Sequence, residues 1–501
     1  MRFGRRPAAA VSFTLSFAFL IKRFFGNISL VVVLNLLVKP GWVVVENLVQ
    51  DRLGHAAFGL VTALSALAVV VAALADLGLT PYAVQRLAAE PAFVAEEFPT
   101  LLPLRGGLNA LALGVLLAVG WALGYRGAAL GLLAAVGGTW LLTQYAQFLR
   151  GTVQARQQFN ADAVLSVLEK GLLLGAVLLL LPLGLTLDGY VGARLGAAGF
   201  TALLCYGLMT RLLGRVRYRW RWPRARTALA GSLPFALMTL LYGANERLDM
   251  VMLERLASPQ EAGYYAGAYR WVDAVMMYAW TVLPLFFAKF AHAARDPAAQ
   301  RDLLLFGQRI LTLPLLFVVA FGLFRGEVLF WQFAHSQPAE VARMALCLKI
   351  LFLNIGVHAF FAIYSTLLTS NYQQTAVSWL VGVSIALNLG LNLLWLPRYG
   401  AVAAALNTLL CAGFVSGGYL WLVPRRLGVP VPGRLLARLA LAFGLLCGGW
   451  YLARTQLSLS WWLETALMSL AFVGLLPLTR LLSWQELKRL RPRQGARGSD
   501  E

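Results

Sequence analysis

Ionisable residues interrupt two long apolar stretches in the middle of the chain, between residues 233 and 289. The first stretch contains Arg247 and Asp249, and the second contains Arg270 and Asp273. An ionised side chain at the centre of a membrane costs about 3 kcal/mol on insertion scales, so such residues usually face one another or a water-filled cavity. Because the planar fork of arginine matches phosphate oxygens, this chemistry favours a polar pathway for an anionic group.

Helical spacing places further polar side chains in the same pathway. Lys39, Trp42 and Glu46 recur at spacings of three and four residues in the first apolar stretch, which puts them on one stripe. Asn245 and Asp249 share a stripe of the seventh stretch in the same way. The predicted phosphate contacts are Arg270, Arg247 and Lys39. The predicted polar or ion-coupling residues of the cavity are Glu46, Asn245, Glu246, Asp249 and Asp273.

These charges also have a structural interpretation, in which they pair with one another and hold helices together. Arg270 and Asp273 are three residues apart and can pair on one helix face. Arg247 can pair with either neighbouring acid, and Lys39 can pair with the acid two turns away. Both interpretations stay open at the level of the sequence.

The composition excludes a soluble globular protein. Of the 501 residues, 59% are hydrophobic and 13% are charged, and the mean hydropathy is +0.70. A soluble protein of this length needs a more polar covering. The net charge of +21 comes mostly from arginines in short loops between apolar spans, which is a topology signal and not a nucleic-acid footprint. The four cysteines show no paired spacing, so neither a disulfide framework nor a metal site is suggested. No cofactor is expected.

The apolar spans predict an all-α polytopic membrane protein with about fourteen transmembrane helices, because a crossing helix needs about 20 apolar residues. The spans lie near residues 26–48, 56–78, 101–123, 127–149, 161–184, 189–212, 228–253, 261–287, 303–324, 342–369, 373–396, 399–423, 436–453 and 460–481. Lys and Arg gather at both termini and in every second connection, which predicts cytoplasmic termini. Asp76 and Arg86 fall at inner helix ends, where they form either a cytoplasmic gate or an anchor.

A weak internal repeat divides the chain into two halves. The segment from Asp51 to Gly59 is similar to the segment from Glu254 to Gly263. We therefore predict two six-helix lobes of the same orientation, related by a pseudo-two-fold axis along the membrane normal. The predicted units are a basic cytoplasmic or interfacial N-terminus (1–25), an N-terminal lobe (26–212), a basic cytoplasmic linker (213–227), a C-terminal lobe (228–424), two extra transmembrane helices (436–481) and a basic cytoplasmic tail (482–501).

Several short motifs in this order resemble one family of membrane transporters. Asp51-Arg52-Leu53-Gly54, followed by Phe58-Gly59 and by Asp76-Leu77-Gly78-Leu79, resembles the first helix pair of bacterial polysaccharide-unit flippases. These are the O-antigen (Wzx-type) branch of the multidrug/oligosaccharidyl-lipid/polysaccharide (MOP) exporter superfamily. Residues 261–270 resemble the eighth helix of that family, and residues 151–159 resemble the end of its fourth.

The resemblance covers most of the chain through about residue 425. It implies two bundles like those of multidrug (MATE) transporters and lipid II flippases, in a multi-pass protein of the bacterial inner membrane. The implied activity is transfer of an undecaprenyl-pyrophosphate-linked oligosaccharide to the outer leaflet by alternating access, without a cofactor, for surface polysaccharide and lipopolysaccharide biosynthesis. The implied partners are the lipid-linked oligosaccharide, membrane lipids, and a polysaccharide polymerase or glycosyltransferases.

Two related functions stay open, and one other class is not expected. A lipid II flippase shares the fold, although its signature in the first helix pair is not found here, and a cation-coupled multidrug exporter shares it too. An enzyme is not expected, because the external connections are short. The longest, at 325–341, offers only Glu327 and Glu340 as carboxylates.

Overall fold

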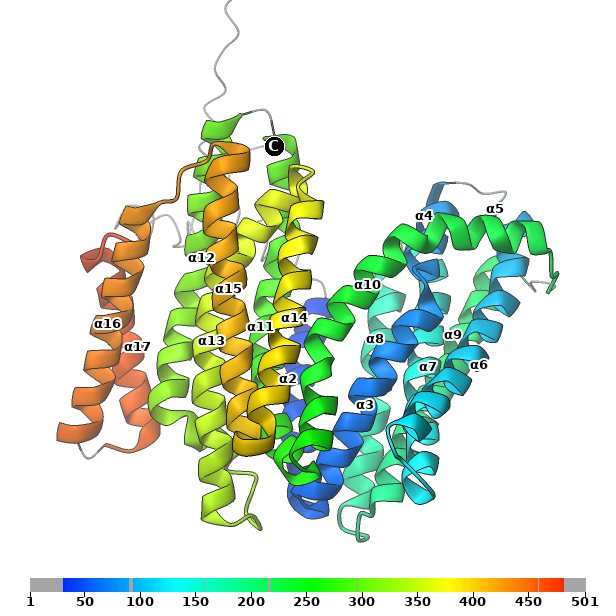
Figure 1. The fold of residues 1–501 in the computed structure, drawn as a ribbon, viewed down its shortest axis with the longest axis horizontal. Coiled ribbons are helices and arrows are strands. Elements are labelled where there is room, and N and C mark those ends of the chain that lie inside the picture. The colour runs from blue at the N-terminus through cyan, green and yellow to red at the C-terminus, as the bar shows by residue number, and fades with distance from the viewer. Residues whose placement is uncertain are drawn as a thin grey trace, which may run out of the picture.

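The structure is a computed structural model, which describes residues 30–89, 93–156, 158–214, 218–294, 296–457 and 459–481. These residues form helices and contain no strand (Figure 1). The long helices are α2 (Leu30–Leu53), α3 (His55–Asp76), α6 (Phe98–Ala122), α7 (Ala128–Ala155), α8 (Phe159–Leu180), α9 (Leu187–Leu213), α10 (Trp222–Leu256), α11 (Pro259–His292), α12 (Pro297–Arg325), α13 (Pro338–Ser370), α14 (Gln374–Tyr399), α15 (Ala401–Leu427), α16 (Gly433–Gln456) and α17 (Trp461–Leu478). The predicted segments 1–25 and 482–501 lie outside the described residues.

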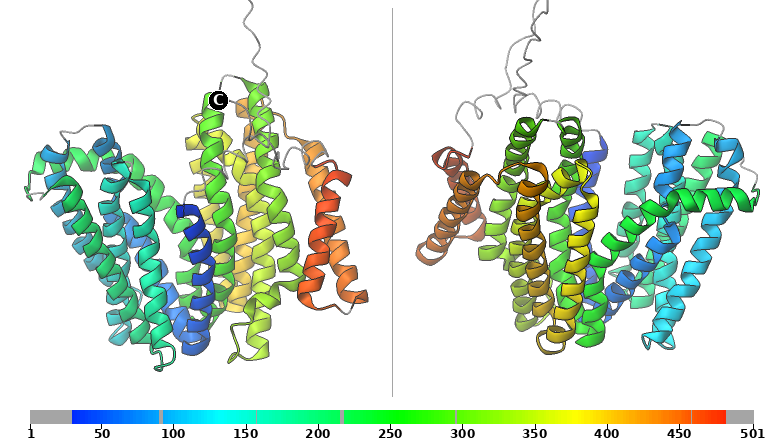
Figure 2. Two further views of the ribbon diagram at one scale, coloured as in Figure 1. Left: turned by 180° about the vertical axis from the view of Figure 1, so that it is seen from behind. Right: turned by 45° about the horizontal axis from the view of Figure 1, so that its top comes forward.

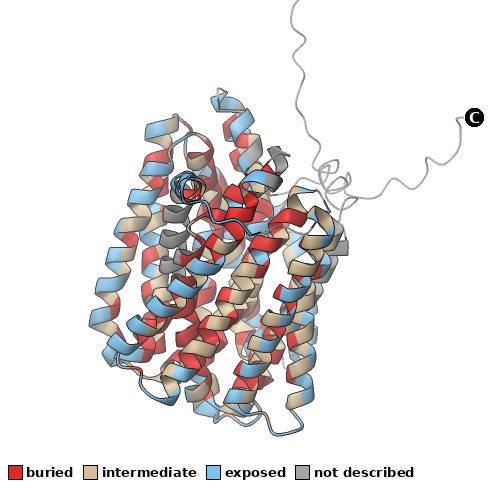
Figure 3. Cartoon of the chain, turned by 90° about the vertical axis from the view of Figure 1, so that its right-hand side faces the viewer, coloured by how far each residue is buried: buried red, intermediate tan, exposed pale blue. Residues whose placement is uncertain are grey.

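The all-helical membrane architecture predicted from the sequence is confirmed. Each predicted span overlaps one long helix, and eleven helices of the described part are long and apolar enough to cross a membrane. The helices α2, α8 and α10 are not among the eleven, so the number of fourteen crossings stays a prediction. Exposed residues lie along the outward faces of the helices (Figure 3). They include large apolar side chains such as Leu203 and Leu470, which are more than 70% exposed, as a surface that faces lipid requires.

Three short elements were not predicted from the sequence. Leu77 and Gly78 have φ values of 43° and 72°, which end α3 and redirect the chain into α4 (Leu79–Ala89). This is followed by α5 (Phe93–Glu96), and a 3-10 turn, η1 (Gly326–Phe330), lies between α12 and α13. In addition, α10 begins at Trp222, inside the stretch predicted as a linker.

The helices form two lobes, which diverge at one end and converge at the other (Figures 1 and 2). Following the predicted division, we assign α2 to α9 to the N-terminal lobe and α10 to α15 to the C-terminal lobe. The start of α10 nevertheless packs against α4 and α6 of the N-terminal lobe (Figure 1). Between them, α3 packs against α10 and α11, and α2 packs against both α8 and α11. The converging end carries the α2–α3 corner. We call it the outer end, because the predicted topology places it outside.

Two glycines allow α3 and α11 to cross at the outer end with their backbones in contact. A Cβ atom on Gly59 would lie 1.8 Å from the carbonyl oxygen of Pro259, and one on Gly263 would lie 2.1 Å from that of His55. The two glycines are equivalent in the internal repeat, and each contacts the first residue of the opposite helix. Exchanged contacts of this kind are what a two-fold axis produces, so the crossing lies on the predicted pseudo-two-fold axis.

The last two helices, α16 and α17, pack beside α12. A fully buried Trp450 lies among Phe317, Phe321 and Phe324. The Glu464 carboxylate, also fully buried, accepts a hydrogen bond of 2.7 Å from Nε of Arg325. These contacts join the extra helices to the C-terminal lobe.

We expect replacement of Glu464 with alanine to lower the free energy of unfolding by about 3–5 kcal/mol, because it leaves the mostly buried Arg325 without its partner. Thermal unfolding in detergent, followed by tryptophan fluorescence, measures the loss. The control is Arg454→Gln, which breaks the half-exposed pair between Arg454 and Glu327 and should cost about 1 kcal/mol or less. Equal destabilisation by both variants would contradict the assignment.

Candidate functional site

Arg270 lies buried between the lobes and is held by three side chains of α2. Its Nε is 3.4 Å from Oε2 of Glu46, and its Nη2 donates a hydrogen bond of 2.6 Å to Oε1 of Gln50. Nη1 donates to Oδ1 of Asn47, and the guanidinium lies 4.3 Å from the ring centre of Phe58. A predicted phosphate contact on α11 and a predicted cavity acid on α2 therefore meet across the lobe interface.

Glu46 also links this cluster to the N-terminal lobe. Its Oε1 accepts a hydrogen bond of 3.4 Å from the hydroxyl of Tyr190 and lies 3.9 Å from Nη1 of Arg194, both on α9. One carboxylate thus faces two guanidinium groups, those of Arg194 and Arg270. The cluster carries an excess of positive charge, which suits it to an anionic ligand.

Arg247 and Asp273 form a looser pair between α10 and α11. Nη2 of Arg247 lies 3.8 Å from Oδ2 of Asp273, and each side chain is about one-third exposed. A long, exposed ion pair contributes little to stability. Both pairings, Arg270 with Glu46 and Arg247 with Asp273, connect different helices, whereas the structural interpretation of the sequence considered partners within one helix.

Asp249 lies apart from these cations, buried in the C-terminal lobe among α10, α14 and α15. Its Oδ1 accepts a hydrogen bond of 2.7 Å from Asn392, and its Oδ2 accepts one of 3.2 Å from Thr408. Among the described residues, no Lys or Arg forms an ion pair with it. A carboxylate buried among neutral partners is costly as an anion. The site can therefore hold a proton or a small cation.

Three predicted site residues lie outside what the structure describes at side-chain level. Lys39 belongs to α2, and Asn245 and Glu246 belong to α10, but the positions of their side chains are not described. Their predicted roles stay predictions.

The two candidates for a cytoplasmic gate make contacts within the N-terminal lobe. Oδ1 of Asp76 lies 3.0 Å from Nη1 of Arg105 and accepts hydrogen bonds from Thr80 at the start of α4. Nη2 of Arg86 lies 3.2 Å from Oε1 of Glu97. These contacts fix helix ends, which favours the anchoring interpretation. The gate stays a prediction.

Sequence reasoning missed several residues of the site. Gln50 lies four residues after Glu46 and continues the predicted stripe on α2, so the same spacing rule would have found it. Arg194 and Lys170 are cations inside apolar spans and were detectable as such; Lys170 lies 5.8 Å from the ring centre of Trp42. Asn47 and Tyr190 carry no signal that distinguishes them from ordinary interior polar residues.

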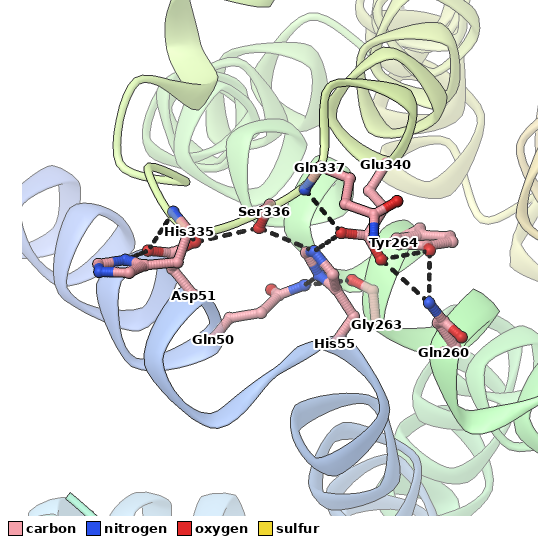
Figure 4. A network of polar contacts seen from close by, with 10 residues as sticks. All are labelled: Gln50, Asp51, His55, Gln260, Gly263, Tyr264, His335, Ser336, Gln337 and Glu340. Atoms are coloured by element: carbon pink, nitrogen blue, oxygen red, sulfur yellow. Dashed lines mark hydrogen bonds and ion pairs between the residues drawn. The ribbon is translucent and has the colours of Figure 1, made fainter. Parts of the chain in front are cut away.

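A polar network closes the outer end between the lobes (Figure 4). Asp51, at the end of α2, accepts hydrogen bonds from the backbone N–H of His335 at 3.1 Å and from the hydroxyl of Ser336 at 3.0 Å, and it pairs with the His335 ring at 2.7 Å. His55 contacts Ser336 at 3.0 Å and Glu340 at 3.7 Å. We call this set of contacts the first latch.

A second latch is related to the first by the internal repeat. Glu254 is the repeat equivalent of Asp51, and its Oε2 accepts a hydrogen bond of 2.7 Å from the hydroxyl of Tyr125, in the α6–α7 connection. Arg255 lies 3.5 Å from the ring centre of Tyr125. Burial, reinforced by the bond to Glu254, raises the pKa of Tyr125, which keeps its hydroxyl protonated and able to donate. In both latches, therefore, an acid at a helix end holds a connection of the opposite lobe.

Comparison with known structures shows the fold. The chain is similar to the lipid II flippase MurJ in an inward closed conformation, with 10% identity and a TM-score of 0.66 over 90% of this chain and 99% of that one. It is similar to an inward-facing MATE-family multidrug resistance transporter of the MOP superfamily, with 16% identity and a TM-score of 0.66 over 82% and 98% of the two chains. An outward-facing MATE structure gives 15% identity and a TM-score of 0.54 over 78% and 93%.

Comparison with families identifies the chain. No curated protein sequence matches it significantly. Residues 24–286, which are more than half of the chain, match the family model described as polysaccharide biosynthesis protein. This match shows that the chain belongs to the polysaccharide biosynthesis protein family.

Proposed function

We propose that the protein is a flippase that moves an undecaprenyl-pyrophosphate-linked oligosaccharide from the inner to the outer leaflet of the bacterial cytoplasmic membrane. The observation that carries the proposal is Arg270, a buried arginine at the lobe interface with a second arginine, Arg194, sharing its carboxylate. A pyrophosphate offers several oxygens to such a pair and replaces Glu46 as their counter-charge. Arg247 and Lys39 extend the proposed phosphate site.

The proposed direction of transport comes from the resemblance to flippases, and the state of the lobes is consistent with it. Two latches and a glycine crossing join the lobes at the outer end, whereas the helices diverge at the other end (Figure 2). The greater similarity to an inward-facing than to an outward-facing transporter supports the same state. In this state the substrate enters from the cytoplasmic leaflet, and the outer end opens after it binds.

A reconstituted flipping assay tests the proposal. The purified protein is placed in proteoliposomes with a fluorescent undecaprenyl-pyrophosphate-linked oligosaccharide, and quenching from outside measures the transfer between leaflets. Lipid II and an organic cation such as ethidium are assayed in parallel. We expect transfer of the oligosaccharide lipid well above that of protein-free vesicles and no transport of the cation.

The competing functions give different results in the same assay. Ethidium transport without oligosaccharide transfer would support a multidrug exporter, and preferential transfer of lipid II would support a lipid II flippase. Failure with all three substrates by protein that is monodisperse and thermally stable would reject the proposed function.

Asp249 is the proposed coupling residue, because its buried carboxylate has no cationic partner among the described residues. A tenfold gradient of a coupled ion supplies about 1.4 kcal/mol, which is enough for about tenfold accumulation of substrate in one leaflet. We expect Asp249→Asn to abolish accumulation driven by a proton or sodium gradient but to retain equilibration between leaflets. The measurement is the final leaflet ratio with and without the gradient. Unchanged accumulation in the variant would exclude Asp249 as the coupling site.

A further inference from the structure

A continuous chain of hydrogen bonds runs from Arg270 to the first latch, and Gln50 is its central member. Oε1 of Gln50 accepts from Nη2 of Arg270 at 2.6 Å. Its Nε2 lies 2.7 Å from the carbonyl oxygen of Gly263 and 2.8 Å from Nδ1 of His55. The side chain is fully buried. One amide therefore contacts the proposed phosphate site with its oxygen and the outer closure with its nitrogen.

The chain has a consistent direction beyond Gln50. The amide nitrogen of Gln50 can only donate, so Nδ1 of His55 accepts and Nε2 of His55 carries the proton. Nε2 of His55 then donates to Oγ of Ser336, whose hydroxyl donates to Asp51 (Figure 4). Each member thus depends on the orientation of the one before it, from Arg270 in the interface to the loop that closes the outer end.

The second partner of Gln50 places the relay at the lobe crossing. Gly263 is the glycine at which α11 touches α3. A Cβ atom added to Gly263 would meet the carbonyl oxygen of His55, which is the other partner of the Gln50 nitrogen. Gln50 therefore spans the two helices that must separate when the outer end opens. The planar amide group fixes its oxygen and nitrogen relative to one another, so movement of one partner weakens at least one of the two sets of hydrogen bonds.

We infer that Gln50 relays occupancy of Arg270 by the pyrophosphate group to the first latch, and so triggers opening of the outer end. The inference rests on the proposed function for the identity of the ligand. Phosphate oxygens are stronger acceptors for a guanidinium than a neutral amide is, so the bound headgroup draws Arg270 away from Oε1 of Gln50. The amide then loses the contact that orients it, and its bonds to Gly263 and His55 weaken together.

Asn47 provides a matched control on the same helix. Its Oδ1 also accepts from Arg270, and it is fully buried like Gln50. Its Nδ2, however, has no hydrogen-bond partner among the residues that the structure describes, so Asn47 touches the proposed phosphate site without touching the latch. Asn47→Leu and Gln50→Met each remove one acceptor of Arg270, but only Gln50→Met cuts the relay.

Spin labels on the two lobes report the opening. Leu183, in the α8–α9 connection, and Tyr399, at the end of α14, are both well exposed and lie at connections of the outer end. The labels are attached at these two positions in a variant that lacks the four native cysteines. Double electron–electron resonance then measures the distance between them in nanodiscs. The probes are undecaprenyl diphosphate and, as an uncharged control, undecaprenol. Equilibrium binding of the diphosphate is measured on the same samples.

The expected results separate the relay from the ligand site. In the parent, saturating diphosphate should lengthen the distance, and undecaprenol should not. Asn47→Leu alters the phosphate site itself, so its affinity for the diphosphate should change, but saturating diphosphate should still lengthen the distance. In Gln50→Met, the long-distance population should already be raised without ligand, and the diphosphate should still bind but change the distribution by less than half of the parental shift. The relay would be overturned if Gln50→Met and Asn47→Leu gave the same distance distributions, either without ligand or with it.

Failure of the proposed function has a different signature. If the parent binds no diphosphate, the ligand assignment is wrong. The relay is then judged on the ligand-free distances alone, where a raised long-distance population in Gln50→Met but not in Asn47→Leu supports it and equal populations reject it.

Discussion

Replacing Arg270 with glutamine is expected to slow flipping of the oligosaccharide lipid by at least about 100-fold, because hydrogen bonds from a charged donor contribute about 1.5–3 kcal/mol each and a fork makes two of them. Each 1.4 kcal/mol corresponds to a factor of ten. The initial rate in proteoliposomes, normalised to folded protein, measures the loss. A rate close to that of the parent would mean that Arg270 only joins α11 to α2.

Thermal stability separates this effect from loss of folding. Arg270→Gln leaves Glu46 paired with Arg194, so no buried carboxylate loses its last cationic partner, and the variant should keep most of its thermal stability while losing transport. The matched control is Arg105→Gln, because Arg105 is also buried but pairs with Asp76 inside the N-terminal lobe. It should lower stability and keep the rate per folded molecule.

The sequence predicted the architecture because the signals for it are local. Apolar length indicates each crossing, and the distribution of arginines indicates orientation. The repeat between the segments that begin at Asp51 and Glu254 predicted a pseudo-two-fold relation, and the glycine crossing and the paired latches agree with it. The short helices α4 and α5 escaped prediction because a left-handed turn at Leu77 and Gly78 has no apolar signature.

Only part of the candidate site was predicted, because its contacts are not local in the sequence. Arg270 and Glu46 each stand out as charges within apolar stretches, but their pairing joins positions more than 200 residues apart, and a single sequence contains no information about such a contact. The same holds for Asp51, whose partners His335 and Ser336 come from a connection that the sequence presented as ordinary. Spacing selects residues on one helix, whereas partners across an interface depend on tertiary packing.

Replacing Gly263 or Gly59 with alanine is expected to prevent closure of the outer end and to stop transport. The added methyl group would lie about 2 Å from a backbone oxygen at either position, and a backbone atom at a helix crossing cannot move aside as a flexible side chain can. The helices α3 and α11 must separate instead, so the inward-facing state loses several of the contacts between them. The spin-label distance across the outer end should be long even without ligand, and the flipping rate should fall at least about tenfold, as a penalty of 1.4 kcal/mol per cycle requires.

A control glycine and a binding measurement distinguish an open protein from a misfolded one. Gly171 lies within α8 and has nothing within 4 Å of the position of a Cβ atom, so Gly171→Ala should be neutral or slightly stabilising. If the crossing variants are merely held open, Arg270 stays in place and undecaprenyl diphosphate should bind at least as tightly as it binds the parent, because a ligand that favours opening binds the open state better. Transport must nevertheless fail. After the substrate is released into the outer leaflet, the outer end can no longer close, so the protein cannot return to the state that faces the inner leaflet. Normal flipping by Gly263→Ala would show that the α3–α11 crossing is not the surface that closes in each cycle.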